Sequence, residues 1–273
     1  MNPYKYIDEG KTHLHTFEGK PLIGTSTVAK ESVNKGDGLM QWFGDLAALD
    51  ALGSGGMLES EHLQLVAEYE DAQKINDWKA KSNAMRKIDG KYKAFASARK
   101  AAIRKRDGSA AVGTARHGVL ESYIAHCIEK GGTPVKAEHE GIQMFIDWAL
   151  AEVDTFYFTE ANCFSAKLWL GGIADIGLKL KNGKRLVGDH KSSKSAFFDQ
   201  YIQAALYDIQ LAENGILDRD GNKKGEWELA DGYVIFPFRS DPFTPEFRWN
   251  ADEFRAVAEG VVRTYKLKEY NHV

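Results

Sequence analysis

Two aspartates and a lysine fall in two neighbouring stretches of strand-like composition within residues 170–194. Asp175 belongs to the first stretch. Asp189 and Lys191 belong to the second, two residues apart and therefore on one face of a strand. Burying two carboxylates beside a lysine costs free energy unless a cation joins them. Carboxylate oxygens are the ligands that Mg²⁺ and Mn²⁺ prefer, so these residues indicate a site for a hard divalent cation.

The turn between the two stretches decides whether the three side chains meet. A two-residue loop at 182–183 would pair Asp175 with His190 and turn Asp175 away from Asp189. A three-residue loop at 181–183, with its glycine in the left-handed region, pairs Asp175 with Asp189 instead. We predict this second register, or a bulge with the same effect; the alternative is an ordinary hairpin with surface charges. The same register turns four apolar residues to the core: Ile176, Leu178, Leu180 and Leu186.

Other polar residues fall on elements that could surround this hairpin. His117 and Glu121 are four residues apart and share one face of a helix predicted from residue 114 to about 130. Glu160 lies in a β-like stretch just before the hairpin. Gln203 and Tyr207 are four apart on the helix predicted after it, at 197–213. The plainer interpretation is that the histidine is a cap or a packed residue and that the last pair serves helix packing.

The composition is that of a globular protein with a full core. The chain has 273 residues, 43% of them hydrophobic, and a formal net charge of -3. No apolar run approaches the roughly 20 residues that span a bilayer, so we expect no membrane segment and a cytoplasmic location. The two cysteines, Cys127 and Cys163, cannot form a four-thiolate cluster on their own, so we expect no iron–sulfur cluster.

A basic helical segment extends over residues 58–107 and is followed by a predicted break at Asp107-Gly108-Ser109. Aromatic residues are interleaved with its lysines and arginines, which favours contact with a nucleic-acid backbone. A solvated helix face is the alternative. The candidate DNA-binding residues in this segment are Lys91, Lys93, Arg99, Lys100, Arg104 and Lys105. We treat the chain as a single domain, 1–273, with this segment as an insertion.

Five short elements follow one another between residues 114 and 210. They are His117, Glu160, Gly171-Gly172-Ile173-Ala174-Asp175, Asp189-His190-Lys191 and Gln203-Ala204-Ala205-Leu206-Tyr207. In this order they resemble the PD-(D/E)xK nuclease superfamily, and most of all its branch of RecB nuclease domains, phage exonucleases and the mitochondrial genome maintenance exonuclease. The usual Asp-Tyr-Lys-Thr is Asp-His-Lys-Ser in this chain, which keeps the acid and the lysine.

The resemblance implies a fold and a set of roles. The fold would be α/β, with a restriction-endonuclease-like core at 114–240 whose mixed central β-sheet is flanked by helices. The residues implied to bind Mg²⁺ or Mn²⁺ are His117, Asp175, Asp189 and His190, the last through its carbonyl group with its ring turned away. The implied catalytic residues are Asp175, Asp189, Lys191, Gln203 and Tyr207. Glu121 and Glu160 are candidates for an outer shell or a second metal, and Arg116, Ser192 and Lys194 for DNA binding.

The function implied is a metal-dependent DNA exonuclease of phage or bacterial recombination and repair type. Single-stranded or duplex DNA ends would be its substrate, and an annealing protein or a helicase a possible partner. Two alternatives keep the same residues: a structure-specific endonuclease or nickase, and a non-catalytic DNA-binding module. An iron enzyme using His117 and Asp189 would leave Lys191 and Asp175 without a role.

Overall fold

The chain divides into two compact units. The computed structural model describes the backbone of residues 3–8, 13–33 and 37–270, and their side chains except those of 37–40, 102–114 and 269–270. The first unit comprises Met1–Asn34 and Val112–Val273, and the second comprises Lys35–Ala111. The second unit therefore includes the predicted basic segment and begins well before it.

The first unit is an α/β structure built on a mixed sheet, in which the described residues form eight strands. Their order is β11-β10-β7-β6-β5-β8-β9, with β4 beside β6. β10 runs parallel to β7 and β4 parallel to β6, while the other pairs are antiparallel. The strands are β4 (Ile23–Gly24), β5 (Val153–Ser165), β6 (Leu170–Leu180), β7 (Arg185–Lys191), β8 (Ile216–Leu217), β9 (Lys223–Gly225), β10 (Gly232–Pro237) and β11 (Glu246–Arg248). A smaller antiparallel sheet consists of β1 (Tyr4–Asp8), β2 (His13–Phe17) and β3 (Lys20–Pro21).

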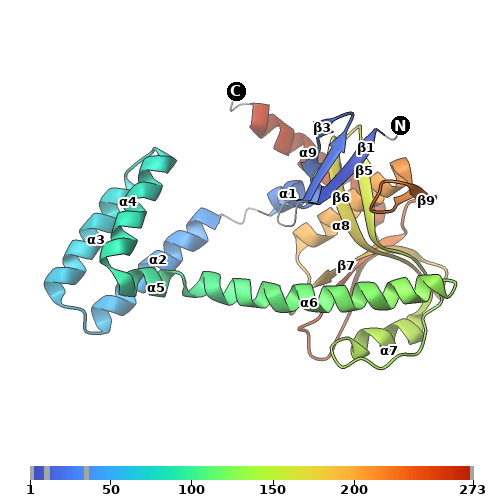
Figure 1. Cartoon of the computed structure of the whole chain (residues 1–273), viewed down its shortest axis with the longest axis horizontal. Helices are drawn as coiled ribbons and strands as arrows, with labels where there is room; N and C mark the ends of the chain where they lie inside the picture. Colours follow the sequence, from blue (N-terminus) through green and yellow to red (C-terminus); the bar gives the residue numbers. More distant parts are fainter. Residues whose placement is uncertain (1–2, 9–12, 34–36, 271–273) are drawn as a thin grey trace. The chain divides into compact units, whose positions relative to one another are not determined.

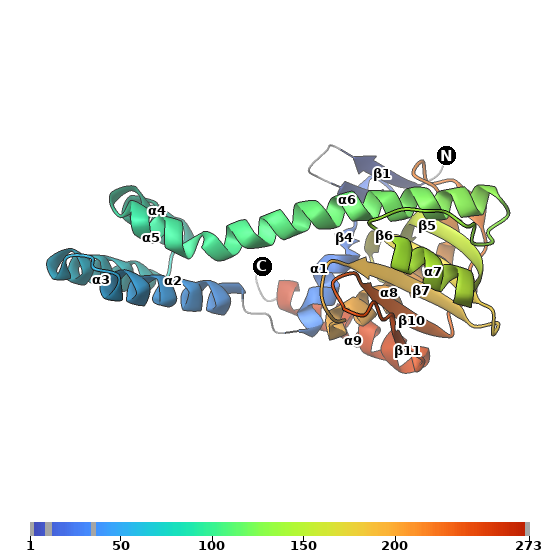
Figure 2. The same ribbon diagram turned by 90° about the horizontal axis from the view of Figure 1, so that it is seen from below.

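Helices cover both faces of the mixed sheet (Figures 1 and 2). The C-terminal part of α6 (Ala101–Glu129) and α7 (Gln143–Glu152) enclose one apolar core with β5, β6 and β7. On the other face, α8 (Phe198–Asn214), α9 (Ala251–Tyr270) and the short α1 (Thr25–Ala29) enclose a second core. A single turn, η1 (Lys30–Ser32), follows α1. The predicted α/β architecture with a flanked mixed sheet is confirmed at this level.

The β6–β7 hairpin has the predicted register. The Leu180 N–H donates to the Lys184 carbonyl at 2.8 Å, and Gly183 has a φ of 87°, in the left-handed region that glycine adopts readily. Ile176 pairs with Gly188, so the same register continued by one residue sets Asp175 opposite Asp189. The apolar residues of the opposite face belong, as expected, to the core beneath α6 and α7.

Two glycines at the start of β6 let other elements approach the strand. A Cβ atom on Gly171 would lie 2.5 Å from the Cβ of His15, and one on Gly172 would lie 2.7 Å from Cε1 of Tyr207. Both distances are shorter than real carbon contacts, so a larger residue would displace the partner. The Thr25 hydroxyl also donates to the Gly171 carbonyl at 3.1 Å. The Gly-Gly pair therefore ties the N-terminal segment and α8 to the strand that carries Asp175.

Asp208 on α8 is a buried hub between α8, α9 and β10. Its carboxylate accepts hydrogen bonds from Trp227 Nε1 at 2.8 Å, the Ala230 N–H at 2.9 Å and the Tyr233 hydroxyl at 3.1 Å. Arg255 of α9 completes the set with an ion pair at 2.5 Å. Because all four donors bind the same carboxylate, the negative charge of Asp208 is buried together with its partners and links α8, α9 and β10.

The second unit is formed by α2 (Asp37–Ser54), α3 (Glu59–Gln73), α4 (Trp78–Lys91) and α5 (Lys93–Arg99). They share an apolar core that includes Leu65, Tyr69 and Phe95. At 107–109 the predicted break is wrong, because the backbone continues as α6. A single glycine in a helix costs only about 1 kcal/mol, which the rest of a long helix can offset. No helix in the described part of the chain combines the length and apolar composition needed to cross a membrane.

Replacing Asp208 tests the hub. We expect Asp208→Ala to lower the free energy of unfolding by about 3–5 kcal/mol, since it removes the buried charge partner of Arg255 and the shared acceptor of three other donors. Asp252→Ala is the matched control: Asp252 contacts the same arginine at 2.6 Å, but its side chain is 96% exposed. Asp252→Ala should lower the free energy of unfolding, measured by chemical denaturation, by about 1 kcal/mol or less. Equal losses for the two variants would contradict the assignment.

His15 predicts a pH dependence of stability. Burial lowers the pKa of its imidazole to about 4, and its Nδ1 lies 2.7 Å from the Tyr4 hydroxyl. Because this value is below the unfolded value of about 6.5, His15 stabilises the fold above pH 6.5 and loses this effect as the pH falls towards 4. The advantage of wild type over His15→Gln in unfolding free energy should shrink by on the order of 2 kcal/mol between neutral pH and pH 4. A constant difference across this range would contradict the argument.

Candidate metal centre

The β6–β7 hairpin places two carboxylates and a lysine at one point of the sheet. Asp175 Oδ2 accepts a hydrogen bond from the His190 backbone N–H at 3.0 Å. Asp189 is 1% exposed, and Lys191 Nζ lies 2.5 Å from its Oδ2. The Asp175–Asp189–Lys191 group predicted from the register is therefore present as a buried group on neighbouring strands.

His117 joins this group from α6, where it faces the sheet. Its Nε2 lies 2.7 Å from Glu160 Oε1 and 3.7 Å from Asp175 Oδ2. The adjacent Glu160 carboxylate raises the pKa of His117 to about 9 against the effect of burial, and Asp175 adds to this rise. A cation that binds Nε2 must consequently displace a proton from this imidazole.

Glu160 reaches His117 from an unusual backbone conformation. Within β5 it has a φ of 48°, which non-glycine residues rarely adopt in a strand. Such a conformation costs on the order of 1–3 kcal/mol and persists where the surroundings enforce it, often at functional sites. The spacing of residues in the sequence does not reveal this conformation. The prediction of Glu160 as an outer-shell or second-metal residue did not include its direct contact with His117.

His190 places its ring, as well as its backbone, beside the aspartate. The ring is buried and packs against Phe145, Phe236 and Phe238. Burial lowers its pKa to about 3, so it is neutral and can act as a ligand. Its Nδ1 lies 3.8 Å from Asp175 Oδ2. We expected this ring to turn away, but the aromatic pocket holds it next to Asp175.

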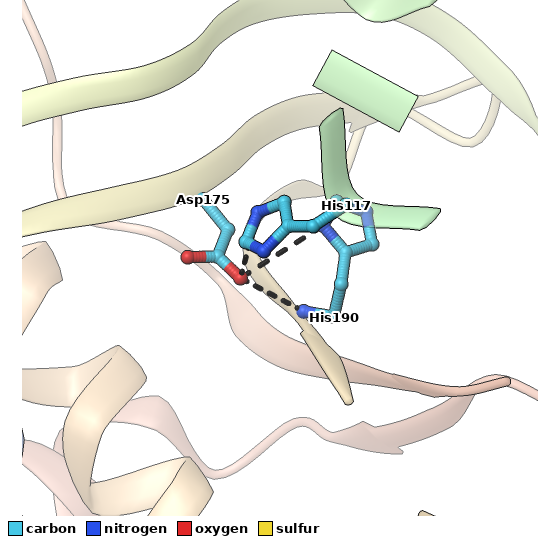
Figure 3. Close-up of side chains that lie close together, drawn as sticks. All are labelled: His117, Asp175 and His190. Atoms are coloured by element: carbon cyan, nitrogen blue, oxygen red, sulfur yellow. Dashed lines mark hydrogen bonds and ion pairs between the residues drawn. The ribbon is translucent and has the colours of Figure 1, made fainter. Parts of the chain in front are cut away.

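One ligand atom each from His117, Asp175 and His190 lies within 4.8 Å of the others, as Figure 3 shows for the three side chains. Asp189 lies beside this trio, and its buried carboxylate has Lys191 as its ion-pair partner. Two neighbouring buried carboxylates with one lysine are costly unless a further cation compensates them. The carboxylates suit Mn²⁺ and Mg²⁺, whereas imidazole nitrogens favour transition metals, so of the two expected cations Mn²⁺ fits this mixed set better.

The pKa values of Asp189 and Lys191 are both raised, for different reasons. Burial raises the pKa of Asp189 to about 7, although Lys191 opposes this. Burial lowers the pKa of Lys191, but the Asp189 and Asp175 carboxylates outweigh it and raise the pKa overall. The lysine is therefore an ammonium ion at neutral pH and forms an ion pair with the Asp189 carboxylate.

Gln203 and Tyr207 lie on the face of α8 that covers the sheet. Gln203 Nε2 donates to the Tyr207 hydroxyl at 2.8 Å, and the tyrosine ring packs over Gly172. Burial raises the pKa of Tyr207 well above its ordinary value, and Asp175 and Asp189 contribute to the rise. The tyrosine therefore lies near both carboxylates and serves as packing for the strand that carries Asp175.

Sequence reasoning missed the next layer of this packing. Gln210, three residues after Tyr207, is fully buried, and its amide donates to the Thr25 hydroxyl at 2.9 Å. Thr25 in turn bonds the Gly171 carbonyl. The available signal was weak: a hydroxyl-rich segment at 25–27 and a buried-looking glutamine on the inner face of α8.

The remaining predicted residues of the first unit lie around the group or apart from it. Glu121 is not among the metal-ligand trio; it pairs with Arg219 at 2.9 Å. Arg116 is half-buried one residue before His117, and its Nη1 donates to the Phe238 carbonyl at 3.3 Å. Ser192 and Lys194 are exposed in the segment that follows Lys191.

The candidate DNA-binding residues of the second unit are mostly engaged in ion pairs. Lys91 pairs with Glu68 at 2.5 Å. Arg99 and Lys100 share Asp89, at 2.7 Å and 3.1 Å. Lys93 is exposed, and the side chains of Arg104 and Lys105 lie outside the described residues. The charges of three of the six candidates are thus neutralised within the unit itself.

Divalent cations should stabilise the protein through this centre. At a Mn²⁺ concentration about 100 times the dissociation constant, the unfolding free energy should rise by about 3 kcal/mol. Asp175→Asn and His117→Gln should abolish the shift in melting temperature, while Glu121→Gln should retain it, because Glu121 pairs with Arg219 instead. Loss of the shift in the Glu121 variant, or its persistence in the other two, would contradict the ligand assignment.

Comparison with known proteins adds no family to this geometry. No protein-family model matches the chain. A search of curated proteins likewise finds no significant match. The family resemblance therefore depends on the short elements quoted above, and the function has to be argued from the side chains that the fold brings together.

Proposed function

We propose that the protein is a metal-dependent DNA exonuclease with a restriction-endonuclease-like core. The observation that supports this best is the register of the β6–β7 hairpin, which sets Asp175 beside Asp189 and Lys191. His117 approaches the same point from α6. The combination of two carboxylates, a lysine and a helix histidine is the one that the resemblance implies for PD-(D/E)xK nucleases.

The arrangement of the sheet is compatible with this proposal. A mixed sheet lies between α6–α7 and α8–α9, and the candidate residues project from its central strands, β6 and β7. β7 and β10 run parallel, so their ends meet at the edge where Lys191 lies beside Pro237. Side chains at such an edge are open to a substrate while their backbone is held in the sheet.

The metal would be held by His117, Asp175 and His190, with Asp189 adjoining. When bound, Mg²⁺ or Mn²⁺ would neutralise charge on the phosphate and acidify a bound water. Lys191, an ammonium ion at the end of β7, would orient the attacking water and stabilise the charge that develops on the phosphate. Glu160 contacts the same Nε2 atom that faces Asp175, so its carboxylate would face a cation bound there and would not hold the ring from behind.

The same residues would serve an endonuclease or a DNA-binding module, so substrate topology decides between them. An exonuclease requires a strand end, whereas an endonuclease cuts a closed circle. A binding module would cut neither. We favour the exonuclease because the resemblance is closest to the exonuclease branch of the superfamily.

The decisive assay uses end-labelled linear DNA and covalently closed circles, single- and double-stranded, with Mg²⁺ or Mn²⁺. We expect stepwise loss of nucleotides from linear DNA and intact circles. Lys191→Ala should lower the rate by at least about 100-fold, the usual cost of removing one electrostatic stabiliser. Lys184→Ala at the exposed hairpin turn is the control and should keep full activity. Cut circles would indicate an endonuclease, and no cleavage of any substrate would refute the enzymatic proposal.

A further inference from the structure

Three cationic side chains form a rim beside Lys191. The Phe238 N–H donates to the Lys191 carbonyl at 2.9 Å, and the Arg239 N–H donates to the Ser193 carbonyl at 3.0 Å. Arg116 stacks over the Phe238 ring, with its Cζ 5.4 Å from the ring centroid. The end of β10 thus brings Arg116 and Arg239 to the segment that carries Lys191 and Lys194. We call Arg116, Lys194 and Arg239 the basic rim.

The charges of the basic rim are available to a ligand. None of its three residues forms an ion pair with another described residue, in contrast to Lys91, Arg99 and Lys100 of the second unit. Lys194 and Arg239 are exposed, and the guanidinium of Arg116 is held by a ring and a carbonyl group, neither of which neutralises it. Unpaired cations beside a phosphate-cleaving group are what the neighbouring phosphates of a strand require.

The opposite side of His117 has the reverse character. A groove of about 560 Å³ extends there between α6, β5 and the β8–β9 hairpin, and Glu160 lies on its wall. Its charged lining consists of four carboxylates and two cations: Glu121, Glu129, Glu160, Asp218, Arg219 and Lys224. Both cations are already paired, Arg219 with Glu121 at 2.9 Å and Lys224 with Asp218 at 2.8 Å. This acidic groove repels a polyanion.

We propose that a single DNA strand reaches the metal centre across the basic rim and not along the acidic groove. Arg239, which sequence reasoning did not single out, would bind a phosphate next to the one being cleaved, together with Arg116 and Lys194. This inference rests on the proposed nuclease function for its substrate. It concerns binding, however, and can therefore be tested without cleavage.

Salt-dependent binding in the presence of a chelator provides the first test. Labelled oligothymidine is titrated with the full chain at several salt concentrations, and the slope of log K against log [salt] is measured. Arg239→Gln should weaken binding and reduce the slope by about 0.7, the value for one lost single-strand phosphate contact. Lys224→Gln in the acidic groove is the matched control and should leave both unchanged.

The opposite pattern, with Lys224→Gln changing the slope and Arg239→Gln leaving it unchanged, would overturn the proposal. So would the absence of oligothymidine binding by the wild-type chain. Failure of the nuclease proposal has a different signature: binding through the rim would persist while no substrate is cleaved with Mg²⁺ or Mn²⁺. The two ideas can therefore fail separately.

Site-specific crosslinking locates the strand directly. Cys127 and Cys163 are buried, so an introduced cysteine should dominate the reaction with a thiol-reactive oligothymidine. Ser192→Cys beside the rim should crosslink efficiently, while Ala125→Cys in the groove should not, each yield being normalised to its reaction with a small maleimide. A higher normalised yield at position 125 than at position 192 would refute the rim as the path of the strand.

Discussion

The pairing of β6 with β7 is the constraint on which the rest of the first unit depends. A shift of one residue would turn Asp175 to the opposite face and separate it from Asp189 and Lys191. The left-handed Gly183 at the turn and the hydrogen bond from the His190 N–H to Asp175 act at the two ends of this pairing. Forming this register therefore also brings Asp175, Asp189 and Lys191 together, while His117 is added from α6.

Two of the buried carboxylates, those of Asp208 and Asp189, have contrasting electrostatic surroundings. Asp208 is surrounded by four donors, including Arg255, and its charge is compensated by the fold itself. Asp189 has Lys191 as its ion-pair partner and lies beside a second carboxylate, that of Asp175. The first arrangement fastens helices to the sheet. The second leaves two carboxylates beside one lysine, an excess of negative charge that an added cation can neutralise. Such an arrangement is typical of functional sites.

The fold class and the hairpin could be predicted because they follow from local rules. The turn sequence at 181–183 and the alternation along β6 and β7 determine the register, whereas His117 was singled out by the family resemblance. Three features depended on tertiary contacts that no spacing reveals: the left-handed Glu160, the His190 ring held by Phe145, Phe236 and Phe238, and the position of Arg239 beside Ser193. Charge partners also escaped prediction, as Lys91 and Glu121 illustrate, because their acids and bases are distant in sequence.

The close packing around Gly171 and Gly172 has a consequence for the interpretation of mutational scans. No side chain larger than hydrogen fits at either position without displacing His15 or Tyr207. A saturation library selected for function would therefore deplete substitutions at these glycines as strongly as at Asp175, although neither glycine has a side chain that could take part in chemistry. Intolerance to substitution in this segment measures steric crowding as well as chemistry. Only assays that separate folded abundance from turnover can assign each position to one cause or the other.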